Sequence, residues 1–152
     1  MVIALPLALV AAAPAVSSQL PDVAAMTATA GVMCVVSASK KGADPSRFAS
    51  DPTWLRSPDG KSFRHRSMPI EVTFPEDSDG IARICEVRAT LPSQIIQAGL
   101  KAGLESSLTS KPLEQSDSTV WMFNTKDGPR GLQFFPDKTS DQPKVRLIGA
   151  AF

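Results

Sequence analysis

The chain has 152 residues, which is long enough for one domain of ordinary size. Its formal net charge is only +1, so the chain as a whole has no positive field that would attract nucleic acid. Its apolar residues, 43% of the total, exclude disorder throughout the chain. Tyrosine is absent and histidine occurs once, which restricts the acid–base and metal chemistry that depends on histidine.

Residues 1–15 predict an export signal. Val2–Val10 is apolar, no charged residue precedes Asp22, and Ala13-Pro14-Ala15 supplies the small residues of a cleavage site. We therefore expect cleavage after Ala15, a single mature domain over 16–152 and a periplasmic or secreted location. No basic residue precedes the apolar run, so either the true start lies upstream or the signal is weak. A retained membrane anchor and a buried N-terminal helix are the alternatives to a cleaved signal. The run is short for a membrane span, and Pro6 and Pro14 disfavour a helix.

The next segment predicts two helices and a loop. Asp22–Val36 follows a proline, begins with an acid and repeats apolar residues at helical spacing. Asp44-Pro45 is typical of a helix start, and we expect a short helix to about Ser50. Asp51–Lys61 contains two prolines and an Asp-Gly pair, so we expect a loop whose Trp54 and Leu55 plug one end of the core.

The middle of the chain predicts strands. Ser62–Met68 is a candidate edge strand. Ile70–Phe74 and Ile81–Leu91 alternate apolar and polar residues on either side of an acidic loop, which indicates a hairpin. In Ile81–Leu91, the face that includes Ile81, Cys85, Val87, Ala89 and Leu91 is expected to be buried.

The last third predicts a long helix and three strands. The helix runs from Pro92 to about Leu108, and a polar connector over Thr109–Ser118 follows it. Ile96, Leu100, Leu104 and Leu108 form its apolar stripe, with Ile95 beside it. The strands are Thr119–Thr125, Leu132–Phe135 and Lys144–Ile148, the first two separated by a turn over Lys126–Gly131. The element order favours an α+β fold with a single antiparallel β-sheet and the helices packed on one face.

The two cysteines lie on different predicted elements, Cys34 on the first helix and Cys85 on the strand Ile81–Leu91. An exported chain meets an oxidising environment, so we expect one helix–strand disulfide that closes a loop of about 50 residues and contributes about 4 kcal/mol. Two free buried thiols are the alternative. A redox pair would need Cys-x-x-Cys, and a zinc site would need about four ligands, so we expect neither a metal nor a cofactor.

The densest basic cluster consists of Lys61, Arg64, His65 and Arg66. It is a candidate anion-binding site for phosphate or carboxylate groups of an envelope component. Solvated charges that discourage strand pairing at a sheet edge are the alternative.

Other candidate chemistry is weaker. Asp77–Gly80 resembles the start of a calcium loop but lacks the remaining ligands, so a turn is expected. Serine catalysis would need His65, and no Gly-x-Ser-x-Gly elbow is present. Glu71 and Glu86 are a candidate acidic pair across the hairpin. Four aromatic side chains are expected in the core rather than on a ligand platform. These are Trp54, Trp121, Phe134 and Phe135.

The element order and the positions of Cys34 and Cys85 resemble a broad group of small exported bacterial proteins of unknown function. The resemblance implies an α+β fold and supplies no catalytic residues. We therefore predict a periplasmic, non-enzymatic binding or accessory protein with no nucleic acid ligand and no transmembrane span in the mature chain. Another envelope protein or an anionic envelope component is the expected partner. The alternatives are an envelope hydrolase that uses His65 or an acidic pair, and a subunit of a larger envelope assembly.

Overall fold

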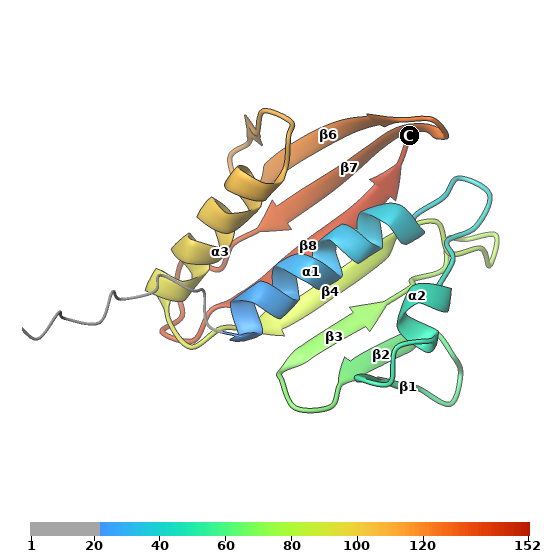
Figure 1. Ribbon diagram of the computed structural model, residues 1–152, viewed down its shortest axis with the longest axis horizontal. Helices are drawn as coiled ribbons and strands as arrows, with labels where there is room; N and C mark the ends of the chain where they lie inside the picture. The colour runs from blue at the N-terminus through green and yellow to red at the C-terminus, as the bar shows by residue number, and fades with distance from the viewer. Residues whose placement is uncertain (1–21) are drawn as a thin grey trace, which may run out of the picture.

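The computed structural model describes residues 22–152, so the expected export signal and its cleavage site lie outside the described residues. This part of the chain forms three helices and eight strands (Figure 1). In chain order they are α1 (Asp22–Ser37), α2 (Ser46–Ala49), β1 (Trp54–Arg56), β2 (Ser62–His65), β3 (Ile70–Thr73), β4 (Cys85–Thr90), α3 (Gln94–Ser107), β5 (Leu113–Glu114), β6 (Thr119–Thr125), β7 (Gly128–Phe135) and β8 (Lys144–Ala151).

The strands form one antiparallel sheet in the order β1-β2-β3-β4-β8-β7-β6-β5. It consists of two four-stranded meanders, β1–β4 and β5–β8, which meet where β4 pairs with β8. The helices α1 and α3 lie side by side on one face, the face toward the viewer in Figure 1. The predicted α+β architecture is therefore confirmed.

Helix α1 lies against the two strands that join the meanders. A Cβ added at Gly149 of β8 would lie 2.5 Å from the Cys34 backbone, so only glycine allows the helix to approach the sheet this closely. The buried positions of α1 include small residues such as Ala24 and Ala30, which lie in the core. Small side chains on both surfaces bring the backbones together, and this explains how a helix with several weak helix formers is held in place.

Helix α3 begins at a side-chain cap and packs by a narrow stripe. The Ser93 hydroxyl oxygen accepts a hydrogen bond from the Ile96 backbone N–H at 3.3 Å. Leu100 and Leu104 are fully buried, as predicted. Ile95, which was placed beside the stripe, is 81% exposed. Gln97, which is not part of the predicted stripe, is also buried.

Two strands occur where loops were predicted. β1 lies inside the expected loop Asp51–Lys61, and β5 lies inside the expected connector Thr109–Ser118. β1 pairs with β2, so β2 is not the edge strand that the sequence indicated. Strands of three and two residues carry too little alternation to be recognised, and both are held by pairing with a longer neighbour. Trp54 is buried as expected, whereas Leu55 is exposed on the other face of the sheet.

Other strand boundaries also differ from the predictions, and β2 ends at His65, three residues before the predicted Met68. β4 begins at Cys85, because residues 81–84 make only one isolated bridge. The prediction that Ile81 lies on the buried face is therefore wrong, and its side chain is exposed. β7 begins at Gly128, which pairs with Thr125, so the turn contains only two residues. Gly128 has a φ of 109°, a conformation that glycine adopts without strain. β8 continues three residues beyond the predicted end, to Ala151.

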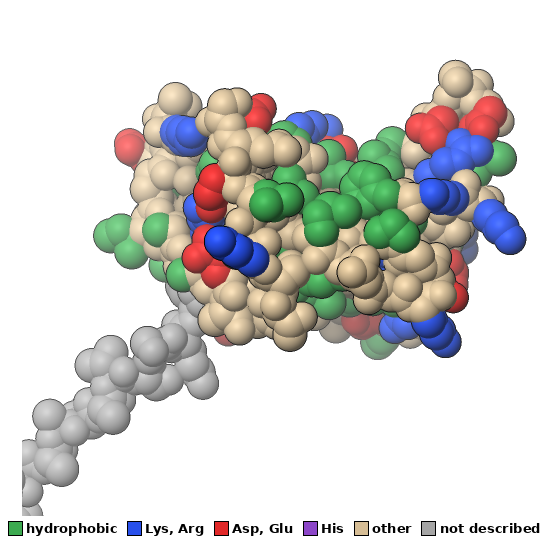
Figure 2. All heavy atoms as spheres, turned by 90° about the horizontal axis from the view of Figure 1, so that it is seen from above, with side chains coloured by type: hydrophobic (Ala, Val, Ile, Leu, Met, Phe, Trp, Pro, Cys, Tyr) green, Lys and Arg blue, Asp and Glu red, His purple; other side chains and the backbone are tan. Residues whose placement is uncertain are grey.

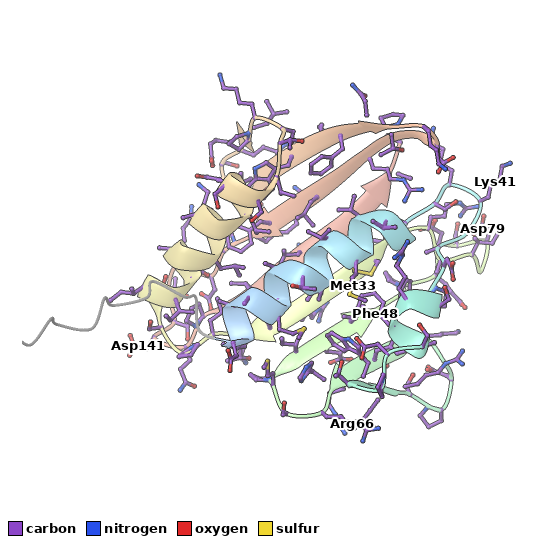
Figure 3. All side chains as sticks on the ribbon, in the orientation of Figure 1. Met33, Lys41, Phe48, Arg66, Asp79 and Asp141 are labelled. Carbon is purple, nitrogen blue, oxygen red and sulfur yellow. A yellow bond between two sulfur atoms is a disulfide. The ribbon has the colours of Figure 1, made fainter. Side chains whose placement is uncertain are left out.

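An aromatic cluster fills the end of the core beneath α2. The Phe48 ring lies 5.3 Å from the Trp54 ring, 5.8 Å from Phe63 and 6.0 Å from Phe74, measured between centroids. Phe48 points from α2 toward the sheet (Figure 3). Trp54, Trp121 and Phe134 are buried, which agrees with the core assignment of these aromatics. The fourth, Phe135, lies on the opposite face of the sheet and is half-buried.

Candidate anion-binding face of the sheet

Strand alternation places a row of charged side chains on the open face, which we define as the side of the sheet opposite α1 and α3. Val72, Val87 and Leu147 face the helices and are fully buried, so their neighbours along each strand face the other way. The register aligns these outward residues across six strands. In order, the row is Leu55, Arg64, Glu71, Arg88, Arg146 and Phe135.

The open face is hollowed beside this row. The hollow has a volume of about 600 Å³, within the usual range for small-molecule sites. Its charged lining residues are Arg64, Glu71, Arg88, Lys144 and Arg146. Met68 and Pro69 contribute apolar surface beside β3, and Phe135 and Pro136 contribute it beside β8. The lining therefore combines four cations with one carboxylate and apolar walls.

Arg88 and Arg146 are directly opposite each other on β4 and β8. Like charges in this position repel, so each guanidinium needs another source of stabilisation. The Arg88 Nε donates a hydrogen bond to Glu86 Oε1, and Glu86 is only 7% exposed. The Arg146 guanidinium carbon lies 4.2 Å from the centroid of the Phe135 ring. Both arginines are thus held in place, and Arg146 makes no salt bridge within residues 22–152.

The structure separates the four residues of the predicted basic cluster. Arg64 alone lines the hollow. Lys61 forms a salt bridge with Glu76 at 2.9 Å, and the hydrogen bond in this pair raises the Lys61 pKa. Arg66 donates from Nε to the Pro52 carbonyl oxygen at 2.6 Å and lies beyond β1 and β2 at the margin of the molecule (Figure 3). His65 points to the helix side. Strand alternation explains this dispersal, since adjacent residues face opposite sides of a sheet.

The His65 side chain is buried and packs within the core. Its side chain is 7% exposed, and its ring packs edge-on against Trp54 with centroids 5.2 Å apart. Its Nδ1 accepts a hydrogen bond from the Ser67 backbone N–H at 3.2 Å, while the Ser67 hydroxyl oxygen lies 3.4 Å from the same nitrogen. Neither residue lines the hollow on the open face. The one histidine is therefore not joined by this hollow to a serine or a carboxylate.

Each of the candidate acidic residues lies beside an arginine. Glu71 and Glu86 do not oppose each other, because Glu71 is opposite Arg88 and Glu86 is opposite Thr73. In the acidic turn, Arg83 forms salt bridges with Asp77 at 2.8 Å and with Asp79 at 2.6 Å. The hydrogen bonds from Arg83 and the Ile81 N–H lower the pKa of Asp79 to about 2. An arginine side chain thus occupies the position at which a calcium loop would bind its cation.

Within residues 22–152, no three His, Cys, Asp or Glu side chains gather as a metal site would require. None of the helices in this part of the chain combines the length and the apolar character needed to cross a bilayer. No family model, curated protein or solved structure matches the chain. Assignment of function therefore rests on the residues themselves.

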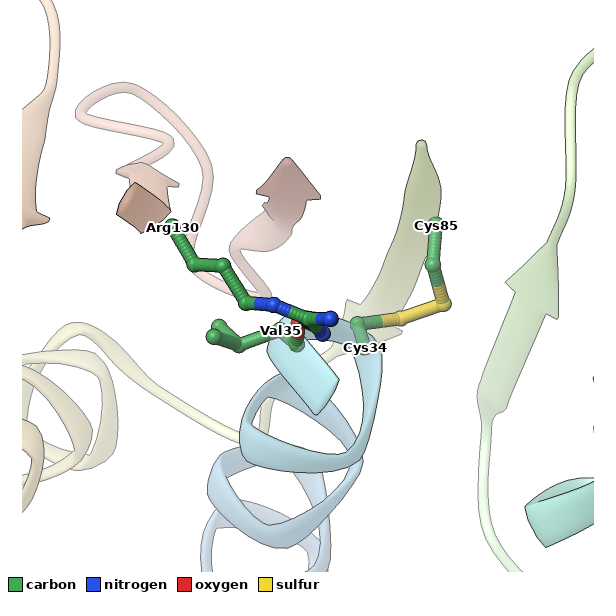
Figure 4. Close-up of a disulfide and its surroundings, with 4 residues drawn as sticks. All are labelled: Cys34, Val35, Cys85 and Arg130. Carbon is green, nitrogen blue, oxygen red and sulfur yellow. Dashed lines mark hydrogen bonds between the residues drawn. A yellow bond between two sulfur atoms is a disulfide. The ribbon is translucent and has the colours of Figure 1, made fainter. Parts of the chain in front are cut away.

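The predicted disulfide is confirmed. Cys34 of α1 and Cys85 of β4 are bonded, with their Cα atoms 5.0 Å apart and both side chains fully buried (Figure 4). On the other side of α1, the Arg130 Nη1 donates to the Val35 carbonyl oxygen at 2.9 Å and also bonds the Val36 carbonyl oxygen. These contacts satisfy carbonyls at the end of the helix and place a cation at the negative end of its dipole.

A second hollow lies on the helix side, between α1 and the β6–β7 hairpin. We call it the helix-side groove; it has a volume of about 410 Å³. Its apolar lining residues are Val32, Val35, Val36, Leu108 and Phe123. Val32 is 42% exposed and Val36 is 45% exposed, so this surface is open to solvent. Hydrophobic side chains gather in the middle of the face that Figure 2 shows. The sequence did not indicate this groove, because its lining comes from α1, from Leu108 after α3 and from the β6–β7 hairpin, which lie far apart in the chain.

Proposed function

We propose that the protein is an exported, non-enzymatic binding protein that holds an anionic ligand on the open face of its sheet. The observation that carries the proposal is the hollow in which Arg88 and Arg146 oppose each other beside Lys144 and Arg64. Bringing these cations together costs free energy, and a carboxylate or phosphate group between them would offset that cost by charge-assisted hydrogen bonds. The apolar walls would contact the rest of the ligand.

Two features support export. The apolar start of the chain ends in Ala13-Pro14-Ala15, and disulfides such as Cys34–Cys85 persist mainly in oxidising compartments. The test is the intact mass of the protein from the envelope fraction of native cells, with and without alkylation. We expect a chain that begins at Val16 and takes up no alkyl group. A full-length chain with two alkylated thiols would contradict export.

The binding test titrates the mature chain with inorganic phosphate and with glutarate. Binding is measured from the chemical shifts of the backbone amide resonances. We expect saturable shifts at residues of β4 and β8. Arg146→Gln should weaken binding by about tenfold or more, since a hydrogen bond to a charged group contributes about 1.5–3 kcal/mol.

Arg66→Gln is the matched control for the binding test. Arg66 is close to Arg64 in sequence but binds the Pro52 carbonyl outside the hollow, so its replacement should leave affinity unchanged. No saturable shift with either probe would contradict the proposal. Equal losses from the two replacements would also contradict it, because the affinity would then come from general positive charge.

A subunit of a larger envelope assembly is the second candidate, and the helix-side groove is the observation that favours it. Val36→Asn places an amide in the groove, whereas Ile95→Asn changes a side chain that is 81% exposed and outside it. If the groove contacts another subunit, Val36→Asn alone should reduce the size at which the protein sediments in native envelope extracts. Sedimentation of the unaltered protein as a monomer in those extracts would exclude this function.

A further inference from the structure

The cations of the open face form two groups, and a carboxylate lies between them. Arg64 of β2 is followed across the sheet by Glu71 of β3, and then by the Arg88–Arg146 pair of β4 and β8. Neighbouring strands are about 4.8 Å apart, so the backbone of Arg64 lies about 10 Å from that of Arg88 and about 14 Å from that of Arg146. All four side chains line the same hollow.

We propose that this hollow selects molecules with two anionic groups separated by an uncharged spacer. This inference rests on the proposed function and specifies its ligand class. One anionic group would lie between Arg88 and Arg146, and the second would reach Arg64. The spacer would cross β3.

Glu71 would discriminate against ligands that carry negative charge in their centre. It makes no salt bridge within the described part of the chain, and it occupies the middle of the row. A ligand with charge in its centre would place that charge against the Glu71 carboxylate, whereas an uncharged spacer avoids this repulsion. A repulsive group that acts against the wrong ligand is a general source of specificity.

The walls of the hollow also suit such a ligand. Met68 and Pro69 are on the β3 side, and Phe135 and Pro136 are on the β8 side. A hydrocarbon spacer gains by covering apolar surface of this kind, at about 25 cal/mol for each Å² removed from water. A short dianion with adjacent charges can use only the Arg88–Arg146 pair, so it should bind as weakly as a single anion.

The experiment measures the affinity of the mature protein for linear dicarboxylates of increasing length by titration calorimetry. The series is malonate, glutarate, pimelate and azelate, with nonanoate as a single anion of the same chain length as azelate. Tripolyphosphate represents a continuous polyanion. We expect affinity to rise at least tenfold from malonate to the best of the longer dicarboxylates. Nonanoate should bind about tenfold more weakly than azelate.

Three variants test which residues are responsible for these differences in affinity. Arg64→Gln should remove the advantage of azelate over nonanoate, and it should weaken azelate far more than malonate. Arg146→Gln should weaken every ligand. Glu71→Gln should raise the affinity for tripolyphosphate severalfold. All three side chains lie at the solvent-facing surface of the sheet, and an unchanged thermal unfolding profile verifies the fold of each variant.

The outcomes separate the inference from the function on which it rests. If malonate binds as tightly as the longer dicarboxylates, the hollow holds a single anion, and the two-ended ligand is wrong while anion binding stands. Equal binding of nonanoate and azelate would show that an apolar chain, not the second charge, supplies the affinity. If no ligand of the series binds, both the inference and the proposed function are wrong.

Discussion

Removal of the disulfide between Cys34 and Cys85 should cost a large part of the stability. The bond joins residues 51 positions apart. Constraint of a loop of this length in the unfolded chain contributes about 4 kcal/mol at 25 °C on the chain-entropy model. Stabilities of native domains are about 5–15 kcal/mol, so the protein without the bond should be close to marginal.

Guanidinium chloride unfolding of oxidised and reduced protein measures this contribution. We expect a lower midpoint on reduction and a slightly steeper dependence on denaturant, because the unfolded chain without the link exposes more surface. The double variant Cys34→Ala/Cys85→Ala is the control, since its stability should not respond to reductant. A difference below about 1 kcal/mol between the oxidised and the fully reduced protein would refute the chain-entropy argument.

Three further predictions concern other parts of the fold. Gly149→Ala should destabilise the protein by about 3 kcal/mol in the same unfolding assay, because the new methyl group meets the backbone of α1; a change below about 0.5 kcal/mol would show that the helix is not in close contact with β8. Ser93→Ala should cost about 1 kcal/mol and Ser93→Asp much less, since aspartate also caps a helix; equal losses from the two would contradict the capping role. The pKa of Asp79 is lowered to about 2, so the ionised carboxylate favours the folded state above the unfolded pKa near 4, and this contribution is lost as pH falls toward 2. The stability difference between the protein and Asp79→Asn should therefore shrink over that range, and a difference independent of pH would contradict the pairing of Asp79.

The sequence predicted the elements whose pattern is long enough to reveal a period. The strand Thr119–Thr125 has the predicted bounds, and α1 ends one residue after the predicted Val36. The disulfide followed from two cysteines in a chain expected to be exported. β1 and β5 were missed, because three and two residues cannot show alternation and both strands depend on their partners.

The candidate site was predicted only in part. A basic run at residues 61–66 indicated Arg64, but the run itself does not form a site. Arg88 and Arg146 lie 58 positions apart and become neighbours only through the pairing of β4 with β8. Alternation does indicate that each faces away from the core. Which strands are adjacent is decided by long-range pairing, and no local pattern contains that information.

The placement of α1 has a consequence for the order in which the chain acquires its structure. The helix is made first, yet it lies against β4 and against β8, whose residues 144–151 are synthesised more than one hundred positions later. Its docking surface is thus incomplete until β8 has emerged and paired. For a chain that crosses a membrane unfolded, from its N-terminus onward, Cys34 would reach the oxidising side well before Gly149, the residue that allows α1 to dock closely. Early oxidation of the two thiols would therefore tether the helix to β4 before β8, the other strand of its docking surface, is in place.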